Sequence, residues 1–400
     1  METRLVIGLS SDDGAGEIRA ALVRVGGVGL DSSVECVATA TVPADTAVFT
    51  AAGSAAPAGT APRATADDEG FKIAQHFFDA VRIVADRAAL TLDHILLLGF
   101  HTAPESPSES HAAHVAARLA ELSGTTAVGG FSARDRAAGG HGRPLGPLVD
   151  WVLANDARHS RLVVHIDGVT GLTVLPAAAG LATVAAFQAG PGTILLEQLA
   201  RTMTRNRNQV DARGVLAVQG RQIKPLIRRW ASHPFLRQAP PKYLRLDDFA
   251  GPFIDETIQM TVERGWSVAD VLCTGTHFVA ACPADAVRQF VMNHHRIDQV
   301  LLVGRGTQNG FLLRLLEEQF NSLGIATVAL PKLAPESYEA VTAAVLGCLA
   351  LDGVPSNLPS LTGAAGPRRL GIIVPGSPQN WRLCIEWMHR AVKPLAIRAA

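Results

Sequence analysis

Residues 184–197, VAAFQAGPGTILLE, contain the pattern that best indicates the fold, a strand followed by a glycine turn and a helix. The apolar start of this stretch predicts a buried strand, and Gly190-Pro191-Gly192 then turns the chain into a helix with Thr193 as its predicted N-cap. Such a glycine turn is expected to leave backbone N–H groups free at the positive end of the helix dipole, where proteins hold phosphate. Gln188 leads into this turn. As a neutral residue it can orient a substrate hydroxyl but cannot take its proton as a carboxylate would.

Composition and charge indicate a globular protein with two domains. The chain has 400 residues, of which 48% are hydrophobic, and its 36 basic residues equal its 36 acidic residues. This balance predicts no nucleic-acid partner and no membrane partner. The five cysteines show no pairing or metal-ligand spacing, so we expect reduced thiols and no metal site. A charged start followed at once by a strand predicts no signal peptide, and therefore a cytoplasmic location.

Two strand–turn–strand units indicate an internal duplication. Residues 4–10 and 18–25 read as one hairpin, and residues 162–166 and 172–175 read as a second hairpin around Asp167-Gly168. The continuous apolar runs at 95–99 and 300–304 are typical of strands inside a mostly parallel sheet. Further helices are predicted at residues 71–90, 110–122, 214–230, 255–264, 310–323 and 381–392. Strands alternating with helices predict an α/β protein in two halves with a cleft between them.

Motifs along nearly the whole chain are similar to those of the anhydro-N-acetylmuramic acid kinase family, to which levoglucosan kinases are closely related. The segment at 137–145 resembles the family's AAGGQGAPL, 165–173 its NIGGIAN-x-T, 186–193 its GFDTGPGN, 240–247 its PPKSTGRE and 303–309 its CGGGA-x-N. The family's NLPS-x-TGA is intact at 357–364. The resemblance implies a two-domain actin-like ATPase (sugar kinase) fold with a central cleft. It also implies a bacterial enzyme that opens a 1,6-anhydro sugar with water while phosphorylating its 6-oxygen from ATP.

Several boundaries and partners follow from this resemblance. We expect an N-terminal part at residues 1–158 with a variable loop at 43–70, a C-terminal part at 159–375 and a closing helix at 376–400. A homodimer is implied as well. The implied nucleotide-binding positions are Ser11, Asp12, Asp13, Gly14, Gly190, Gly192, Gly304, Arg305, Gly306 and Asn309.

The chain departs from the family at the reactive positions. Gln188 stands where the family has the aspartate expected to activate water, and Arg305 replaces the middle glycine of the nucleotide loop. The carboxylates of Asp12 and Asp13 in the first hairpin are expected to repel phosphate oxygens unless a metal lies between them. These losses together favour lost or altered phosphoryl transfer, a reaction that depends on positioning and on charge compensation.

Polar residues also appear where the family has other types. His141, His165 and Asp167 are such gains, whereas Asp135 matches an acidic position of the family and His101 lies in a segment that has diverged. His165 and Asp167 are two residues apart on a strand, so their side chains share a face and could form a base and its orienter, or alternatively a structural pair. Asp135 could contact substrate or form a surface ion pair. The candidate catalytic residues are thus Gln188, His165, Asp167, His141, Asp135 and His101.

Three functions remain open at this stage. The favoured one is a repurposed or degenerate kinase homologue, a pseudokinase that keeps the cleft, binds a sugar-like or other polar small molecule and needs no cofactor. The first alternative is an active anhydro-sugar kinase that uses ATP and Mg²⁺ and has a relocated base, Asp167 or Asp135. The second alternative is a non-catalytic regulatory or scaffolding partner.

Overall fold

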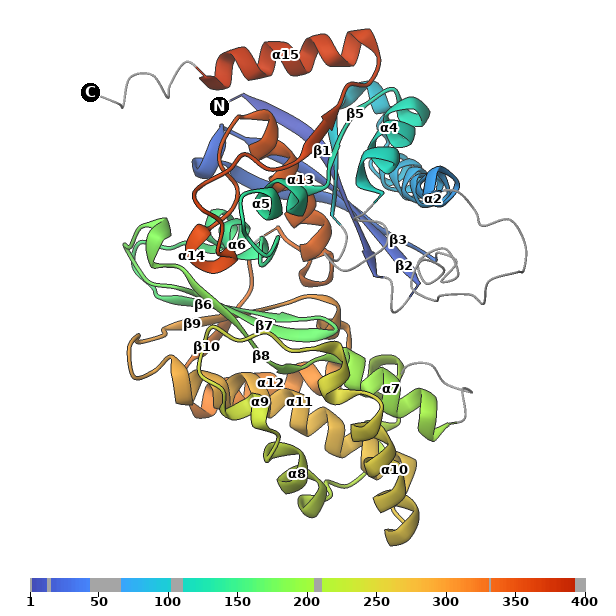
Figure 1. The fold of residues 1–400 in the computed structure, drawn as a ribbon, viewed down its shortest axis with the longest axis vertical. Coiled ribbons are helices and arrows are strands. Elements are labelled where there is room, and N and C mark those ends of the chain that lie inside the picture. The colour runs from blue at the N-terminus through green and yellow to red at the C-terminus, as the bar shows by residue number, and fades with distance from the viewer. Residues whose placement is uncertain are drawn as a thin grey trace. The chain divides into compact units, whose positions relative to one another are not determined.

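The computed structural model describes residues 2–12, 16–43, 66–101, 111–204, 211–330 and 332–392 (Figure 1). The chain forms two compact units. The first combines Met1–Leu153 with Lys332–Ala400, and the second is Ala154–Pro331. The first boundary lies close to the predicted one. Residues 332–375, however, belong to the first unit rather than to the predicted C-terminal part, because helix α13 (Tyr338–Leu351) packs on the strands β1 and β4 of the first sheet.

The first unit contains a six-stranded sheet in the order β11-β5-β4-β1-β2-β3. The predicted opening hairpin is present as its antiparallel pair β1 and β2. The strands are β1 (Thr3–Asp12), β2 (Glu17–Gly26), β3 (Ser33–Pro43), β4 (Ile95–His101), β5 (Thr126–Gly129) and β11 (Ile372–Val374). The helices are α2 (Ala66–Arg87), α4 (Ala112–Ser123), α5 (Phe131–Ala137), α6 (Gly146–Ala154), α13, α14 (Pro359–Thr362) and α15 (Pro378–Val392).

Helices cover both faces of this sheet. Ile7 and Leu9 are fully buried in one core with α2 and α4, which run side by side (Figure 1). Side chains alternate along a strand, so Gly8 between them faces α13. A Cβ on Gly8 would lie 1.8 Å from the carbonyl oxygen of Ala340, and one on Gly99 would lie 2.3 Å from that of Ala343. Only glycine therefore allows α13 to approach β1 and β4 this closely.

The second unit repeats the topology of the first with a five-stranded sheet in the order β10-β9-β6-β7-β8. In both sheets the first three strands are antiparallel, and the first strand then pairs in parallel with the fourth. The strands are β6 (Arg161–Ile166), β7 (Val169–Leu175), β8 (Ala185–Pro191), β9 (Gln299–Val303) and β10 (Ala326–Val328). The helices are α7 (Thr193–Met203), α8 (Lys224–Ala231), α9 (Pro234–Arg237), α10 (Pro252–Arg264), α11 (Val268–Phe290) and α12 (Gly310–Ser322). The repeated topology confirms the predicted duplication.

One predicted helix is only partly present. Residues 214–223 are not helical as predicted but contain short 3-10 turns. The Asp211 carboxylate accepts the N–H groups of Leu216 and Ala217, and Gly220 packs against the carbonyl of Ala269. Residues 131–151, although rich in glycine and charged residues, form α5 and most of α6, with Phe131 fully buried. Residues 44–65 of the predicted variable loop lie outside the described residues.

No helix among the described residues is long and apolar enough to cross a membrane. The cytoplasmic location and the homodimer stay predictions.

Candidate functional site

Gln188 is held in a fixed orientation on β8. Its backbone N–H donates to the carbonyl of Lys242 at 3.3 Å, and its side-chain Oε1 accepts the N–H of Leu244 at 2.5 Å. The amide oxygen is therefore engaged by the backbone of the 242–244 segment. The amide NH₂ has no partner among the residues that the structure describes, so Gln188 offers a hydrogen-bond donor at the position of the family's base.

His165 and Gln188 belong to one row across three neighbouring strands. His165 on β6 pairs with Gly171 on β7, and Gly171 pairs with Gln188 on β8. Paired residues project on the same face of a sheet, so the two side chains share a face with a glycine between them. The row before it, formed by Val164, Leu172 and Phe187, belongs to the apolar core beneath the helices. His165 and Gln188 thus project on the opposite face, and His165 is half-buried there.

The Gly190-Pro191-Gly192 turn does not offer the free N–H groups that we predicted. The N–H of Thr193 donates to the carbonyl of Asp167 at 2.8 Å, and those of Gly192 and Ile194 donate to the carbonyl of Gly168 at 3.0 and 3.3 Å. A Cβ on Gly192 would lie 2.1 Å from the Asp167 carbonyl oxygen, so this glycine permits the close approach of the β6–β7 turn. The N-cap of α7 is Gly192, and Thr193 is its first helical residue.

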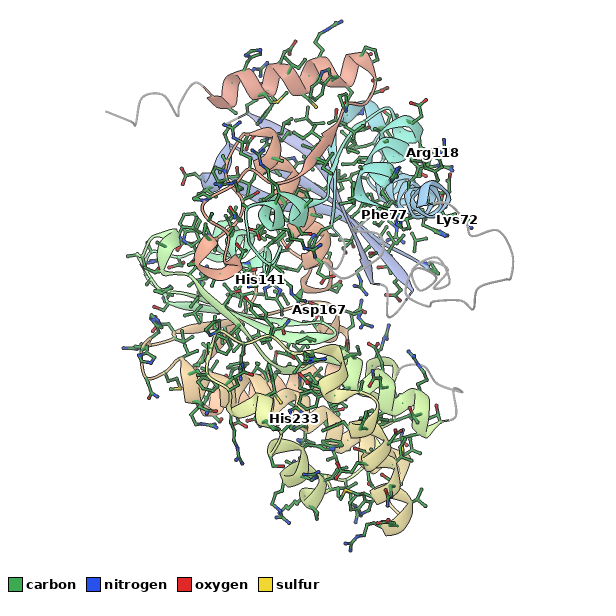
Figure 2. All side chains as sticks on the ribbon, viewed as in Figure 1. Lys72, Phe77, Arg118, His141, Asp167 and His233 are labelled. Atoms are coloured by element: carbon green, nitrogen blue, oxygen red, sulfur yellow. The ribbon has the colours of Figure 1, made fainter. Side chains whose placement is uncertain are left out.

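Asp167, which is labelled in Figure 2, contacts a second turn of the second unit, at residues 304–305. Its Oδ1 accepts the N–H of Arg305 at 2.8 Å, and its carboxylate fills the space beside Gly304, whose φ is +96°. The side chain of Arg305 folds onto α7, where it donates to Thr193 Oγ1 at 2.7 Å and forms an ion pair of 2.5 Å with Glu197. Both charged side chains of that pair are nearly buried, at 11% and 6% exposure. Arg305 therefore belongs to an internal cluster with Asp167, Thr193 and Glu197.

Other positions that were predicted to bind nucleotide have structural neighbours as well. A Cβ on Gly306 would lie 2.3 Å from the side chain of Ile166, so this glycine again permits close packing. The side chain of Asn309 caps α12 by accepting the N–H of Leu312 at 3.1 Å. A Cβ on Gly190 would lie 2.9 Å from that of Cys282.

Asp135 lies in the first unit and is fully buried, so it is not a surface residue. Its Oδ1 accepts from Asn357 Nδ2 and Thr362 Oγ1, both at 2.7 Å, and its Oδ2 accepts the N–H of Gly142 at 2.8 Å. This carboxylate ties the 139–146 segment to the NLPS-x-TGA motif. His141 in that segment is exposed and donates its backbone N–H to the carbonyl of Thr362 at 2.8 Å (Figure 2).

The carboxyl end of β1 presents two buried hydroxyl groups. Ser10 and Ser11 are 3% and 8% exposed, and within the described ranges their Oγ atoms have no hydrogen-bond partner. Ser10 pairs in register with His101 at the end of β4, whose ring lies 6.3 Å from that of Phe131. Asp13, Gly14 and the side chain of Asp12 lie outside the described residues. Within the described ranges, no three His, Cys, Asp or Glu side chains come together in a way that could hold a metal ion.

Sequence analysis did not single out Glu197, the ion-pair partner of Arg305. The sequence did contain a signal for it. Glu197 follows Thr193 by four residues, and residues at this spacing lie on the same face of a helix. Lys242 lies in the segment similar to the family's PPKSTGRE. It is 1% exposed and donates hydrogen bonds to backbone carbonyls of α9.

Comparison with known proteins agrees with this architecture. The family model described as "Anhydro-N-acetylmuramic acid kinase" matches residues 5–376. A protein of that name from Acaryochloris marina is 31% identical over 92% of this chain and 98% of its own length. Another from Salinibacter ruber is also 31% identical, over 93% and 97%.

Solved structures with a similar arrangement share little sequence. Component A of the (R)-2-hydroxyglutaryl-CoA dehydratase of Acidaminococcus fermentans has a TM-score of 0.44 at 12% identity, covering 86% of this chain and 96% of its own. A ROK family glucokinase from Streptomyces griseus, in complex with glucose and AMPPNP, has a TM-score of 0.37 at 15% identity, covering 86% and 98%. The duplicated sheets and the family match together confirm the actin-like sugar-kinase fold. With the family model matched across residues 5–376, the chain belongs to the anhydro-N-acetylmuramic acid kinase family.

Proposed function

We propose that this protein is an ATP-dependent kinase for a 1,6-anhydro amino sugar or a closely similar sugar, in which His165 is the base and Gln188 orients the attacking oxygen. Similarity to curated kinases over nearly the whole chain supports this function over a degenerate relic. The single observation that carries it is the in-register row of His165, Gly171 and Gln188. This row lies on the face of the sheet opposite the helix-covered core, and it includes the strand position that corresponds to the family's base.

In this proposal, the two polar side chains of the row together replace the family's aspartate, one by orienting the attacking oxygen and the other by accepting its proton. Strands lie about 4.8 Å apart, so the Cα atoms of His165 and Gln188 are separated by about 10 Å across Gly171. That span leaves room for a sugar hydroxyl or a water between the side chains. The amide NH₂ of Gln188 donates a hydrogen bond to the oxygen, and the neutral imidazole of His165 accepts its proton. Neither Asp167 nor Asp135 is needed as the base.

The surroundings of Asp135 favour a structural role over that of a relocated base. Its two oxygens already accept three hydrogen bonds in a fully buried position. These donors occupy the oxygen lone pairs that a base would need to reach a substrate hydroxyl or a water. In the proposed reaction it holds the 139–146 segment, including His141, in place.

The first unit offers groups that fit a nucleotide phosphate. Ser10 and Ser11 at the carboxyl end of β1 project on opposite faces of the strand, and the buried hydroxyl of either one can donate to a phosphate oxygen on its own face. Bound ATP would supply the phosphoryl group, with Mg²⁺ carried mainly by its phosphates, as is usual for this ion. Arg305 is paired with Glu197, so it adds no net charge that would attract or repel the nucleotide.

The test is phosphorylation of 1,6-anhydro-N-acetylmuramic acid with Mg-ATP, followed by mass spectrometry of the sugar phosphate. We expect product from the wild type and about a 100-fold lower kcat in His165→Ala, the usual contribution of a general base. His294→Ala, which removes an exposed histidine of the same unit, serves as the matched control. A His165→Ala variant with wild-type kcat would exclude His165 as the base.

A second candidate function is sugar binding without phosphoryl transfer. It is favoured by the neutral side chain of Gln188 and by the saturated carboxylate of Asp135. Calorimetric titration with the anhydro sugar separates the two functions. Sugar binding in the presence of Mg-ATP, with no sugar phosphate formed, would support the binding protein.

A further inference from the structure

A cavity of about 550 Å³ lies in the second unit, on the side of β8 away from Gln188. Its apolar lining comes from β8, α8, α9 and α11 and includes Ala189, Ile227, Leu236, Phe278, Cys282 and Ala286. Ala189 belongs to the apolar core of the helix face, whereas Gln188 projects on the other face of the same strand. The cavity is therefore separate from the proposed sugar site. Its volume is in the range of pockets that bind small molecules.

The rim of the cavity carries an excess of positive charge. Arg237, Asp285 and Arg288 line it, and Asp285 is paired with Arg288 at 2.5 Å. Arg237 is exposed and has no carboxylate partner among the described residues. The thiol of Cys282 adds no negative charge, because burial raises its pKa well above the usual range. One arginine thus stands at the mouth of an apolar cavity without a counter-charge.

A second cation is buried behind the wall of the cavity. Lys242 is 1% exposed, and its Nζ donates to the carbonyls of Phe235 and Leu236 at 3.3 and 3.4 Å. The same nitrogen lies 4.7 Å from the ring centroids of Phe235 and Phe290. No carboxylate of the described residues pairs with it. A buried charge of this kind is costly unless another charge compensates it, and Leu236, which accepts its hydrogen bond, is part of the cavity lining.

We propose that this cavity binds a small organic anion, with one or two rings packed against Phe278 and Leu236 and a single anionic group at Arg237. The apolar lining accounts for the body of the ligand. The two cations without a counter-charge, Arg237 at the rim and Lys242 behind α9, account for its charge. Electrostatic attraction across a lining of low polarity is stronger than in water, so both cations contribute. The ligand does not compete with a sugar, because Gln188 lies on the other face of β8.

A pair of fluorescent probes tests both parts of the proposal. 1-Anilinonaphthalene-8-sulfonate carries the anionic group, and N-phenyl-1-naphthylamine has the same ring system without it. Fluorescence titration of the full chain should show saturable binding of one sulfonate probe per chain, at least about tenfold tighter than the neutral probe. Arg237→Gln should remove most of this difference. An equal affinity for both probes would overturn the anionic part of the proposal, and absence of saturable binding would overturn all of it.

Matched variants locate the probe. Ala281→Trp fills the cavity from α11 and should abolish binding, whereas Ala113→Trp places the same side chain on the exposed face of α4 and should leave it unchanged. Far-UV circular dichroism checks that both variants are folded. Sulfonate binding by Ala281→Trp at wild-type affinity would place the probe elsewhere and refute the site.

A competition experiment tests whether the cavity is separate from the proposed sugar site. Saturating anhydro sugar should not displace the probe, and displacement would refute a separate site. The binding readout does not depend on kinase activity, so it fails or succeeds independently of the proposed function.

Discussion

Replacing Asp135 with alanine tests whether this buried carboxylate acts in structure rather than in proton transfer. The substitution removes the acceptor of three hydrogen bonds, from Gly142, Asn357 and Thr362, in a site with no solvent exposure. A hydrogen bond to a charged group contributes about 1.5–3 kcal/mol, and a buried donor left without a partner costs a similar amount. Ionising the carboxylate in a buried site offsets part of the sum. We therefore expect a loss of about 4 kcal/mol in the free energy of unfolding of the first unit.

Asp135→Asn is the graded control for this prediction. The asparagine Oδ1 can still accept from Asn357 and Thr362, but its NH₂ group faces the N–H of Gly142 and loses that bond. The loss should then be roughly half of that in the alanine variant. Urea unfolding followed by circular dichroism measures both changes. If Asp135→Ala unfolds at the wild-type urea concentration and yet loses sugar phosphorylation, Asp135 has a chemical role and the structural assignment is wrong.

Three further predictions concern charges outside that cluster. Arg305→Gly should cost about 3–5 kcal/mol by leaving Glu197 as an uncompensated buried charge, and adding Glu197→Gln should recover much of the loss in urea unfolding. Backbone hydrogen bonds from Arg158 lower the pKa of Asp156 to about 2, so its stabilisation is complete above the unfolded value of 3.8 and declines as pH falls toward 2. The stability difference between wild type and Asp156→Asn should shrink over that window, and a constant difference would contradict this. Burial lowers the pKa of Lys242 below 10.5, so wild type should gain stability relative to Lys242→Met as pH rises toward 10.5 in thermal unfolding, whereas parallel pH curves would exclude a perturbed Lys242.

The duplicated fold could be predicted from the sequence because its signals are local. The apolar runs at 95–99 and 300–304 became β4 and β9, and the two hairpins appeared with the predicted pairing. The assignment of residues 332–375 could not be predicted in this way. It depends on the fit of α13 against Gly8 and Gly99, a contact between segments more than 200 residues apart in the chain, and periodicity carries no information on such contacts.

Only part of the site geometry could be read from the sequence. His165 and Gln188 were both candidate residues, but the sequence could not show that Gly171 lies between them, because the register across three strands is a tertiary property. Asp167 was paired with His165 on the basis of strand alternation. The turn after β6 also brings this carboxylate to the N–H of Arg305, a contact that strand alternation does not predict. Side chains in turns do not follow the alternation of the strand that precedes them.

The glycine turn at 190–192 shows that a departure from the family, such as Arg305, can be interpreted either as a loss of function or as a structural contact. From the sequence, this turn was expected to hold phosphate through free N–H groups, with Gln188 in place of the family's aspartate and Arg305 in place of a glycine. In the structure the first N–H groups of α7 bond to the carbonyls of Asp167 and Gly168, and Arg305 closes the same junction through Glu197. The glycines therefore hold two turns of one unit together and were not retained for a ligand alone. Arg305 adds an ion pair to this junction without replacing any of its backbone hydrogen bonds. The difference between an active kinase and a binding protein therefore depends on the other face of β8, which carries Gln188. There, the proposed kinase requires His165 to accept the proton that Gln188 cannot take.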